Sequence, residues 1–339
     1  MKKEVFKFSN QSTEIYFDTA FSGIGDLVDR KGAVIITDEH IFKHHKSKFK
    51  GWDTIVLKPG EVYKIQETVD SVIGQLIKLE ADRKTFLIGI GGGVITDITG
   101  YVASVYMRGL RFGFVPTSIL AMVDASIGGK NGIDVGPYKN LVGTIRQPSF
   151  LFYDTNFLQS LPDAEWINGF AEIIKHSCIK DNKMFKALEN HDLGYYRKNK
   201  KALDDLIRKN VLIKSKVVKG DEFEKGDRRL LNFGHTLGHA IENIYELSHG
   251  QAISIGMVAA CRISEKMTGF SETNRVKTVL GKYGLPVEAA YNRKKAFSIL
   301  KMDKKRSGKE MNYVLLKKIG RGTVEAIPMK ELENLLLKI

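Results

Sequence analysis

Cysteine is scarce in this sequence, which contains Cys178 and Cys261 among 339 residues. Both stand in apolar segments with helical spacing, IIKHSCI and MVAACRI. Two thiols are too few for a disulfide framework, and they exclude a zinc cluster built from cysteine alone.

The sequence also lacks a continuous apolar run at its start. MKKEVFKFSNQSTEIYF carries two early lysines with no apolar core behind them, so we expect no secretory signal. Residues 85–107 come nearest to a membrane span, but they contain three adjacent glycines and Asp97. Such a segment favours a buried strand, a tight turn and a buried helix. We therefore expect a soluble cytoplasmic protein with no membrane partner.

Negative charge is in deficit, with 39 Asp and Glu against 53 Lys and Arg and a net charge of +14. An excess of this size suits nucleic acid, an acidic surface or small anions. The basic residues are spread along the chain, apart from clusters at 198–201 and 304–309, and no aromatic stacking pattern accompanies them. These features favour a small molecule with several negative charges over nucleic acid.

The first half of the chain alternates apolar β-like runs with helical patterns. The expected strands and helix cover residues 32–38, 53–60, 61–83, 85–90 and 111–118. This alternation predicts an α/β fold with a doubly wound, Rossmann-like parallel sheet. After Tyr153 most segments are long and amphipathic, with a strand pair expected at MNYVLLKK and GTVEAIP. We predict two domains, 1–154 and a mainly helical 155–339, with the active site in the cleft between them.

Three glycines, Gly91, Gly92 and Gly93, join an expected strand to an expected helix. Without side chains, the amides at the helix start can approach a pyrophosphate, although the turn could equally serve close packing. Asp38 ends an earlier strand, where an acid can accept a hydrogen bond from a ribose hydroxyl or cap a helix.

A glycine-rich stretch at residues 123–140 contains Asp124, Lys130, Lys139 and Asn140. We interpret it as a loop that cradles a phosphate or a polyol, the alternative being a solvated loop with ordinary lysines.

Two segments carry candidate metal ligands. In GFAEIIKHS, Glu172 lies three residues before Lys175 on an apolar helix, where charged groups need partners or a metal. In NFGHTLGHAIE, His235 and His239 are one helical turn apart, but the glutamate of HExxH is missing. With His249 at a further helix start, Glu172 and two of the three histidines would make a catalytic metal site. The spacing leaves open which histidine is left over.

Long motifs throughout the chain resemble one enzyme family, the 3-dehydroquinate synthases. They are, in order, GGGVITDITGYVASVYMRG, VPTSILAMVDASIGGKNGID, KNLVG, INGFAEIIKH, LLNFGHTLGHAIE and HGQAISIGM. The resemblance spans about residues 38–316 and is weakest in the first thirty residues. It implies a lyase of the shikimate pathway, with an N-terminal Rossmann-like domain and a helical C-terminal domain, that uses NAD and zinc or cobalt and is usually a homodimer.

The reaction implied by the resemblance converts the sugar acid phosphate DAHP into 3-dehydroquinate and phosphate. It proceeds by transient oxidation by NAD, elimination of phosphate, reduction, ring opening and aldol closure. The related cyclases that make 2-deoxy-scyllo-inosose or 2-epi-5-epi-valiolone share this chemistry but use substrates without a carboxylate. A metal-dependent alcohol dehydrogenase of similar fold would instead release NADH.

The resemblance also implies roles for individual residues. The metal ligands fall on Glu172, His235 and His249, which leaves His239 to face the substrate phosphate. The other phosphate residues are Lys130, Asn140, Lys304 or Lys305, and Arg108 from the partner subunit. The carboxylate set is Lys214, Arg228 and Asn232, and Asp124 and Lys175 bind substrate hydroxyls. The NAD set comprises Asp38, Glu61, Lys64, Gly91, Gly92, Gly93, Asp97, Thr117, Ser118, Lys130, Lys139 and Ser160.

Overall fold

A computed structural model describes residues 2–136, 138–242, 244–301, 306–307 and 309–338. The chain divides into two compact units. Unit 1 is Met1–Trp166 with Lys214–Glu222, and unit 2 is Ile167–Ile213 with Phe223–Ile339. The predicted domain boundary at residue 154 stays a prediction.

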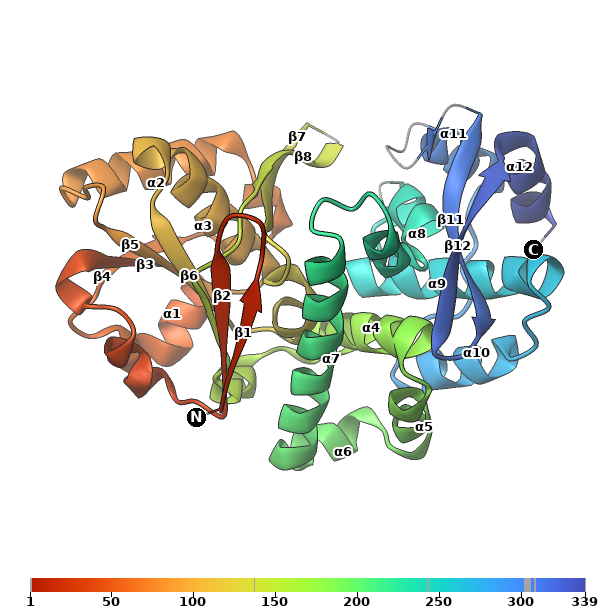
Figure 1. Cartoon of the computed structure of the whole chain (residues 1–339), viewed down its shortest axis with the longest axis horizontal. Helices are drawn as coiled ribbons and strands as arrows, with labels where there is room; N and C mark the ends of the chain where they lie inside the picture. Colours follow the sequence, from red (N-terminus) through yellow and green to blue (C-terminus); the bar gives the residue numbers. More distant parts are fainter. Residues whose placement is uncertain (1, 137, 243, 302–305, 308, 339) are drawn as a thin grey trace. The chain divides into compact units, whose positions relative to one another are not determined.

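Unit 1 is built on a seven-stranded sheet of order β1-β2-β9-β6-β5-β3-β4 (Figure 1). Its strands are β1 (Lys2–Lys7), β2 (Ser12–Phe17), β3 (Ala33–Asp38), β4 (Asp53–Leu57), β5 (Phe86–Gly91), β6 (Arg111–Pro116) and β9 (Phe150–Phe152). All neighbours are parallel except β1 and β2, which form an antiparallel hairpin. The apolar strands AVIITD and FLIGIG are buried along their length, as parallel strands covered on both faces must be.

Helices α1 (Glu39–His45), α2 (Gln66–Lys78) and α3 (Gly93–Val105) connect these strands. One sheet face, with Ile35, Ile88 and Ile90, packs on an aromatic core that includes Phe21 and Phe157. Alternate residues point to the other face, where a Cβ on Gly89 would lie 2.8 Å from Thr99 Oγ1 of α3. Helices on both faces confirm the predicted doubly wound sheet.

The order of the strands places a topological switch point between β3 and β5. The chain passes from β3 outward to β4, whereas it passes from β5 to β6 in the opposite direction. Ligands of doubly wound sheets bind at the carboxyl ends of the strands flanking such a point. Asp38 ends β3 and Gly91 ends β5, so both predicted cofactor positions lie there.

Two expectations in unit 1 need correction. The helix expected over 61–83 is shorter, because Glu61–Tyr63 forms a 3-10 turn before α2 begins. The expected loop at 123–140 contains instead a π-helical turn, Ala121–Ala125, and the ribbon of β7 (Lys130–Val135) and β8 (Tyr138–Ile145). Gly132 pairs with Gly143 in this ribbon, where the strands approach too closely for a side chain.

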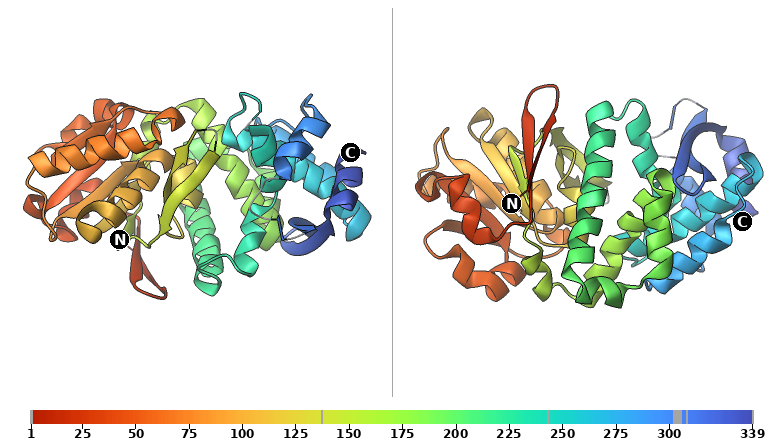
Figure 2. Two further views of the ribbon diagram at one scale, coloured as in Figure 1. Left: turned by 90° about the horizontal axis from the view of Figure 1, so that it is seen from above. Right: turned by 60° about the horizontal axis from the view of Figure 1, so that its bottom comes forward.

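Unit 2 is mainly helical, as predicted. Its helices, two of which cross into unit 1, are α4 (Asp163–Lys180), α5 (Asn182–Asn190), α6 (Leu193–Lys198), α7 (Lys200–Gly220), α8 (His235–Glu242), α9 (His249–Met267), α10 (Thr273–Lys282), α11 (Arg293–Leu300) and α12 (Met329–Leu337). The expected strand pair is β11 (Glu310–Lys318) with β12 (Arg321–Pro328), next to the short β10 (Arg306–Ser307). Ser264 of α9 binds the amide of Leu316 of β11 at 2.9 Å, so the strand pair packs on the buried helix α9 (Figure 2).

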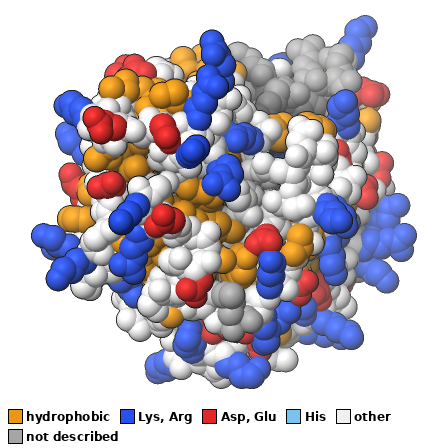
Figure 3. All heavy atoms as spheres, turned by 60° about the vertical axis from the view of Figure 1, so that its left-hand side comes forward, with side chains coloured by type: hydrophobic (Ala, Val, Ile, Leu, Met, Phe, Trp, Pro, Cys, Tyr) orange, Lys and Arg blue, Asp and Glu red, His pale blue; other side chains and the backbone are white. Residues whose placement is uncertain are grey.

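Charged side chains of both signs are interspersed on the surface drawn in Figure 3. Lys and Arg are spread among Asp and Glu on this face and do not form a single tract. In the described residues, no helix is long and apolar enough to cross a membrane.

The close contact between β5 and α3 at Gly89 predicts how a substitution there changes the stability of the fold. Gly89→Ala should destabilise the fold by about 1–3 kcal/mol, because the new Cβ overpacks against Thr99 and Phe114. Gly74→Ala in α2 is the matched control, since nothing lies within 4 Å of its Cβ position. That control should be stabilising by about 0.5–1 kcal/mol through helix propensity. Urea unfolding of both variants measures the difference, and equal midpoints would contradict the close packing.

Candidate metal and cofactor sites

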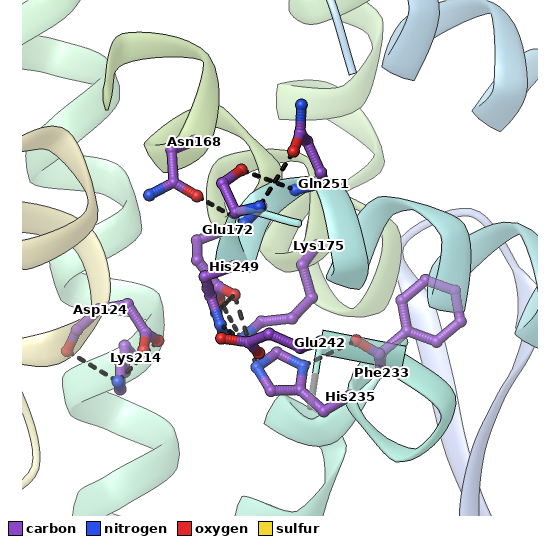
Figure 4. A network of polar contacts seen from close by, with 12 residues as sticks. Asp124, Asn168, Glu172, Lys175, Lys214, Phe233, His235, Glu242, His249 and Gln251 are labelled. Atoms are coloured by element: carbon purple, nitrogen blue, oxygen red, sulfur yellow. Dashed lines mark hydrogen bonds and ion pairs between the residues drawn. The ribbon is translucent and has the colours of Figure 1, made fainter. Parts of the chain in front are cut away.

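Three side chains from three helices converge in unit 2. Glu172 lies within α4, while His235 and His249 are the first residues of α8 and α9. Oε1 of Glu172 lies 3.5 Å from Nε2 of His235 and 3.3 Å from Nε2 of His249 (Figure 4). The possible ligand atoms of all three lie within 4.8 Å of one another. The structure therefore brings together the three residues predicted as metal ligands.

The other nitrogen of each imidazole faces an acceptor. Nδ1 of His235 lies 3.1 Å from the carbonyl oxygen of Phe233, and Nδ1 of His249 lies 3.4 Å from Oε2 of Glu242. A carbonyl can only accept, so Nδ1 of His235 carries the proton and its Nε2 presents a lone pair. Contacts of this kind orient histidine ligands in metal sites. The sequence analysis did not predict a role for Glu242, although this residue lies on the same helix as His239, three residues further on.

Charge balance favours a cation at this point. Glu172 is fully buried and ion-paired with Lys175, one of the predicted substrate residues. Burial lowers the pKa of His249, but its hydrogen bonds to Glu172 and Glu242 outweigh burial and raise the pKa to about 9. A divalent cation bound at Nε2 of His249 would be stabilised by the same two carboxylates in place of that proton. One carboxylate with two imidazoles is a donor set found in catalytic zinc sites, so these residues fit a divalent metal.

His239 lies one helical turn after His235, and their ring centroids are 5.0 Å apart. It also forms a possible ligand group with Glu242 and His249. The HxxxH spacing thus places both rings in the same region. These two groups share His249, and the group predicted from the sequence is the one in which Glu172 lies 3.5 Å from His235.

Local structure fixes where the two ligand helices begin. Gly234, immediately before His235, has a φ of +80°, which favours glycine. Ser248, directly before His249, forms a capping box with Gln251, the third residue of α9, so that the helix starts at His249. Asn168 of α4 accepts a hydrogen bond from the amide of Gly250, which ties α9 to the helix that carries Glu172.

In unit 1 two of the three glycines are closely packed, since a Cβ on Gly91 would lie 2.5 Å from Cβ of Ile95 and one on Gly93 3.2 Å from Cβ of Ala125. β5 ends at Gly91, Gly92 is the N-cap of α3, and Gly93 is its first residue. A Cβ on Gly92 would approach nothing closer than Ser118 Oγ, at 3.6 Å, so this position has room that close packing alone does not require. Thr117 and Ser118 are buried beside the turn, and the amide of Thr117 donates to the carbonyl of Gly91.

Asp38 caps α1 by accepting from the amide of Ile41 at 2.9 Å. Burial raises the pKa of its carboxyl group. The helix-cap alternative is therefore present in the structure, and the position at the end of β3 still fits a ribose contact.

Three predicted residues meet around the buried amine of Lys64, which is itself a predicted cofactor residue. Its Nζ lies 2.5 Å from Asp97, 3.7 Å from Glu61 and 2.6 Å from Oδ1 of Asn140. These neighbours keep the pKa of Lys64 raised despite its burial, and burial raises the pKa of Asp97 to about 6. Asp134, which sequence reasoning missed, accepts from the amide of Asn140 at 2.7 Å.

Lys214 and Asp124, expected to bind different parts of the substrate, form an ion pair in unit 1. Nζ of Lys214 donates to Oδ1 of Asp124 at 2.6 Å and to its carbonyl oxygen at 2.7 Å. The carboxylate holds the ammonium group at the end of α7 in one orientation.

The remaining predicted residues are dispersed through the two units. Arg228 is buried in the 3-10 turn Asp227–Asn232, and Asn232 donates to Glu224 at 2.6 Å. Ser160 contacts His45, a partner that sequence reasoning missed. Arg108, Lys130 and Lys139 are exposed in unit 1, and Lys304 and Lys305 lie outside the described residues.

Comparison with known proteins identifies the family. Residues 54–168 match the N-terminal model of 3-dehydroquinate synthase and residues 169–306 match the C-terminal model. The 3-dehydroquinate synthase of Pyrococcus abyssi is 41% identical over 84% of this chain and 83% of its own length. That of Streptococcus thermophilus is 35% identical over the whole of both chains.

Solved structures agree. The 2-epi-5-epi-valiolone synthase from Streptomyces hygroscopicus, solved with NAD+ and Zn2+ bound, is 26% identical with a TM-score of 0.88, covering 99% of this chain and 98% of its own. A 2-deoxy-scyllo-inosose synthase at 24% identity shares the fold, with a TM-score of 0.86 over 99% of this chain and all of its own. The matches to both family models and to full-length relatives place this chain in the 3-dehydroquinate synthase family.

Proposed function

We propose that this protein converts DAHP into 3-dehydroquinate and inorganic phosphate, as a phosphate-eliminating lyase that depends on NAD and a divalent metal ion, zinc or cobalt. The observation that carries the proposal is the convergence of Glu172 with Nε2 of His235 and His249, within a chain of this family. When bound, the metal would acidify the substrate hydroxyl that is oxidised, and NAD would accept and return its hydride.

Glu172, His235 and His249 would hold the metal. The acceptors at Phe233 and Glu242 aim the Nε2 atoms inward, so little reorganisation would accompany binding. Lys175 is held at Glu172 by its ion pair, where it can donate to a substrate hydroxyl close to the metal. His239 would then face the substrate phosphate.

The substrate's two anions call for separate sets of donors. Lys214, Arg228 and Asn232 would bind the carboxylate, and Asp124, which orients Lys214, would accept from a hydroxyl. Lys130, Asn140, His239, Arg108 and one of Lys304 and Lys305 would bind the phosphate. These residues are mostly cationic donors and poor bases, so the departing phosphate itself would take up the proton in the elimination step.

The NAD site would lie at the switch point of the sheet in unit 1. The pyrophosphate would approach the amides of Gly92 and Gly93 at the start of α3, and Asp38 would accept from a ribose hydroxyl. Glu61, Lys64, Asp97, Thr117, Ser118, Lys139 and Ser160 would surround the remainder of the cofactor. We keep the domain assignment of 1–154 for NAD and 155–339 for metal and substrate.

A homodimer is part of this proposal, and unit 1 offers a surface for it. Apolar side chains are exposed along β8, among them Leu141 at 64% and Ile145 at 43%. Thr144 of β8 contacts Ser104 of α3 at 3.0 Å, which brings this strand beside the exposed Val105 and Met107. Exposed apolar side chains on neighbouring elements are typical of subunit interfaces.

Arg108 follows this surface directly. Both Met107, at φ 51°, and Arg108, at φ 65°, have left-handed backbones, which are strained for residues other than glycine. Strain of this kind persists where a side chain must be presented in a fixed direction. We propose that this turn presents Arg108 to the phosphate site of the partner subunit.

The reaction itself is tested by incubating the purified protein with DAHP, NAD and zinc while following free phosphate and NADH absorbance together. We expect release of phosphate without lasting NADH, because the cofactor is regenerated in each turnover. A sugar phosphate without a carboxylate is the control substrate, and it should be turned over far more slowly. Accumulation of NADH would indicate a dehydrogenase, and preference for the control substrate would indicate another cyclase.

The ligand assignment predicts different outcomes for the two histidines of α8. His235→Ala should weaken metal binding by more than about a hundredfold, since it removes a donor from the site. His239→Ala should retain the metal and lower kcat by about a hundredfold through loss of a phosphate contact. Metal content after dialysis against a weak chelator measures the first effect. Loss of metal from His239→Ala would show that the assignment is wrong.

Mixed dimers test the origin of Arg108. Arg108→Ala and His235→Ala homodimers should both be nearly inactive. A mixed dimer should recover activity, because the metal site of the Arg108→Ala chain receives an intact arginine from its partner. Co-expression with two affinity tags isolates the mixed species, and Lys139→Ala paired with His235→Ala is the control for subunit mixing. Absence of recovery would place Arg108 in its own subunit's site or outside the site.

A further inference from the structure

The turn between β1 and β2 is bound to the end of α7. Oε2 of Glu222, two residues after α7, accepts from the amide of Ser9 at 2.9 Å and from its hydroxyl at 2.7 Å. Oε1 accepts from Nε2 of Gln147 at 3.0 Å. Both partners and Glu222 belong to unit 1, and the hairpin turn lies beside the end of α7 in Figures 1 and 2.

Gln147 extends this contact to the glycine turn before Lys130. Its side chain is buried against Gly129, where an added Cβ would lie 2.9 Å from the amide of Gln147. The amide of Arg146 donates to the carbonyl of Gly129 at 2.8 Å. Gly129 has a φ of +71°, so this turn depends both on glycine and on the side chain packed over it.

Lys214 lies in α7, shortly before this contact. The helix continues for six residues beyond Lys214 to Gly220, ~9 Å at the rise of a helix, and Glu222 follows two residues later. One end of the segment is fixed by the pair of Lys214 with Asp124, and the other by Glu222. The C-terminal end of a helix frays unless its last residues are held.

The hairpin also lies outside the two family models. The N-terminal model begins at residue 54, whereas β1 and β2 end at Phe17. The family models therefore assign this segment no role.

We propose that the β1–β2 turn, through Ser9 and Gln147, clamps Glu222 and thereby sets the positions of Lys214 and of the turn before Lys130. Glu222 is a positioning residue for the two groups that bind the anions of the substrate. This inference rests on the proposed function. A carboxylate suits the task because its hydrogen bonds are stronger than those of a neutral acceptor.

The test compares Glu222→Ala with the wild-type full-length enzyme. We expect the KM for DAHP to rise about tenfold with kcat nearly unchanged, because the clamp supports binding in the ground and transition states alike. Metal content should not change. Amide hydrogen exchange in residues 214–220 should become faster. Glu222→Gln, which keeps the shape of the side chain, provides the same readouts if the alanine variant folds poorly.

Lys3→Gln is the matched control in the same hairpin. It removes an exposed ion pair with Glu14 without touching Glu222, and it should leave KM and exchange as in the wild type. A lower melting temperature for Glu222→Ala with unchanged KM would overturn the inference, as would unchanged exchange in 214–220. If the wild type releases no phosphate from DAHP, the proposed function fails, and the exchange measurement alone decides whether the clamp exists.

Discussion

The buried carboxylate of Glu172 is the constraint on which unit 2 depends. A charge with no exposure to solvent is costly unless cations or hydrogen-bond donors surround it. Lys175 supplies one cation from the same helix, and His235 and His249 approach from the starts of two other helices. Gly234 and the capping box of Ser248 and Gln251 fix where α8 and α9 begin. They therefore also place the two imidazoles beside the buried charge.

Much of this site could be predicted from the sequence, because its ligands stand in locally recognisable patterns. The HxxxH spacing and the apolar setting of Glu172 indicated a metal site, but the spacing alone could not choose among three histidines. The resemblance made the choice, and in the structure Glu172 lies beside the two histidines that it chose, His235 and His249. The parallel sheet was equally accessible, since AVIITD and FLIGIG are continuous apolar runs.

What the sequence could not reveal are contacts between distant residues without a motif. Glu222 and Ser9 are 213 residues apart, and His45 and Ser160 are 115 apart. The ribbon of β7 and β8 was mistaken for a loop because its glycines indicate a turn. In the structure, Gly132 faces Gly143 across two strands. Only the pairing partner distinguishes these two uses of glycine.

Three lysines of the proposed sites share one arrangement that bears on how the protein binds anions. Lys64, Lys175 and Lys214 are buried, and each is paired with a carboxylate, from Asp97, Glu172 and Asp124 respectively. A free lysine side chain carries about 2 kcal/mol of rotamer entropy that binding would otherwise have to overcome. Here the fold has already restricted these chains, so an arriving anion finds oriented ammonium groups. The paired acids also reduce the net positive charge around each ammonium group. Long-range attraction of the substrate therefore comes from the overall charge of the protein, +14.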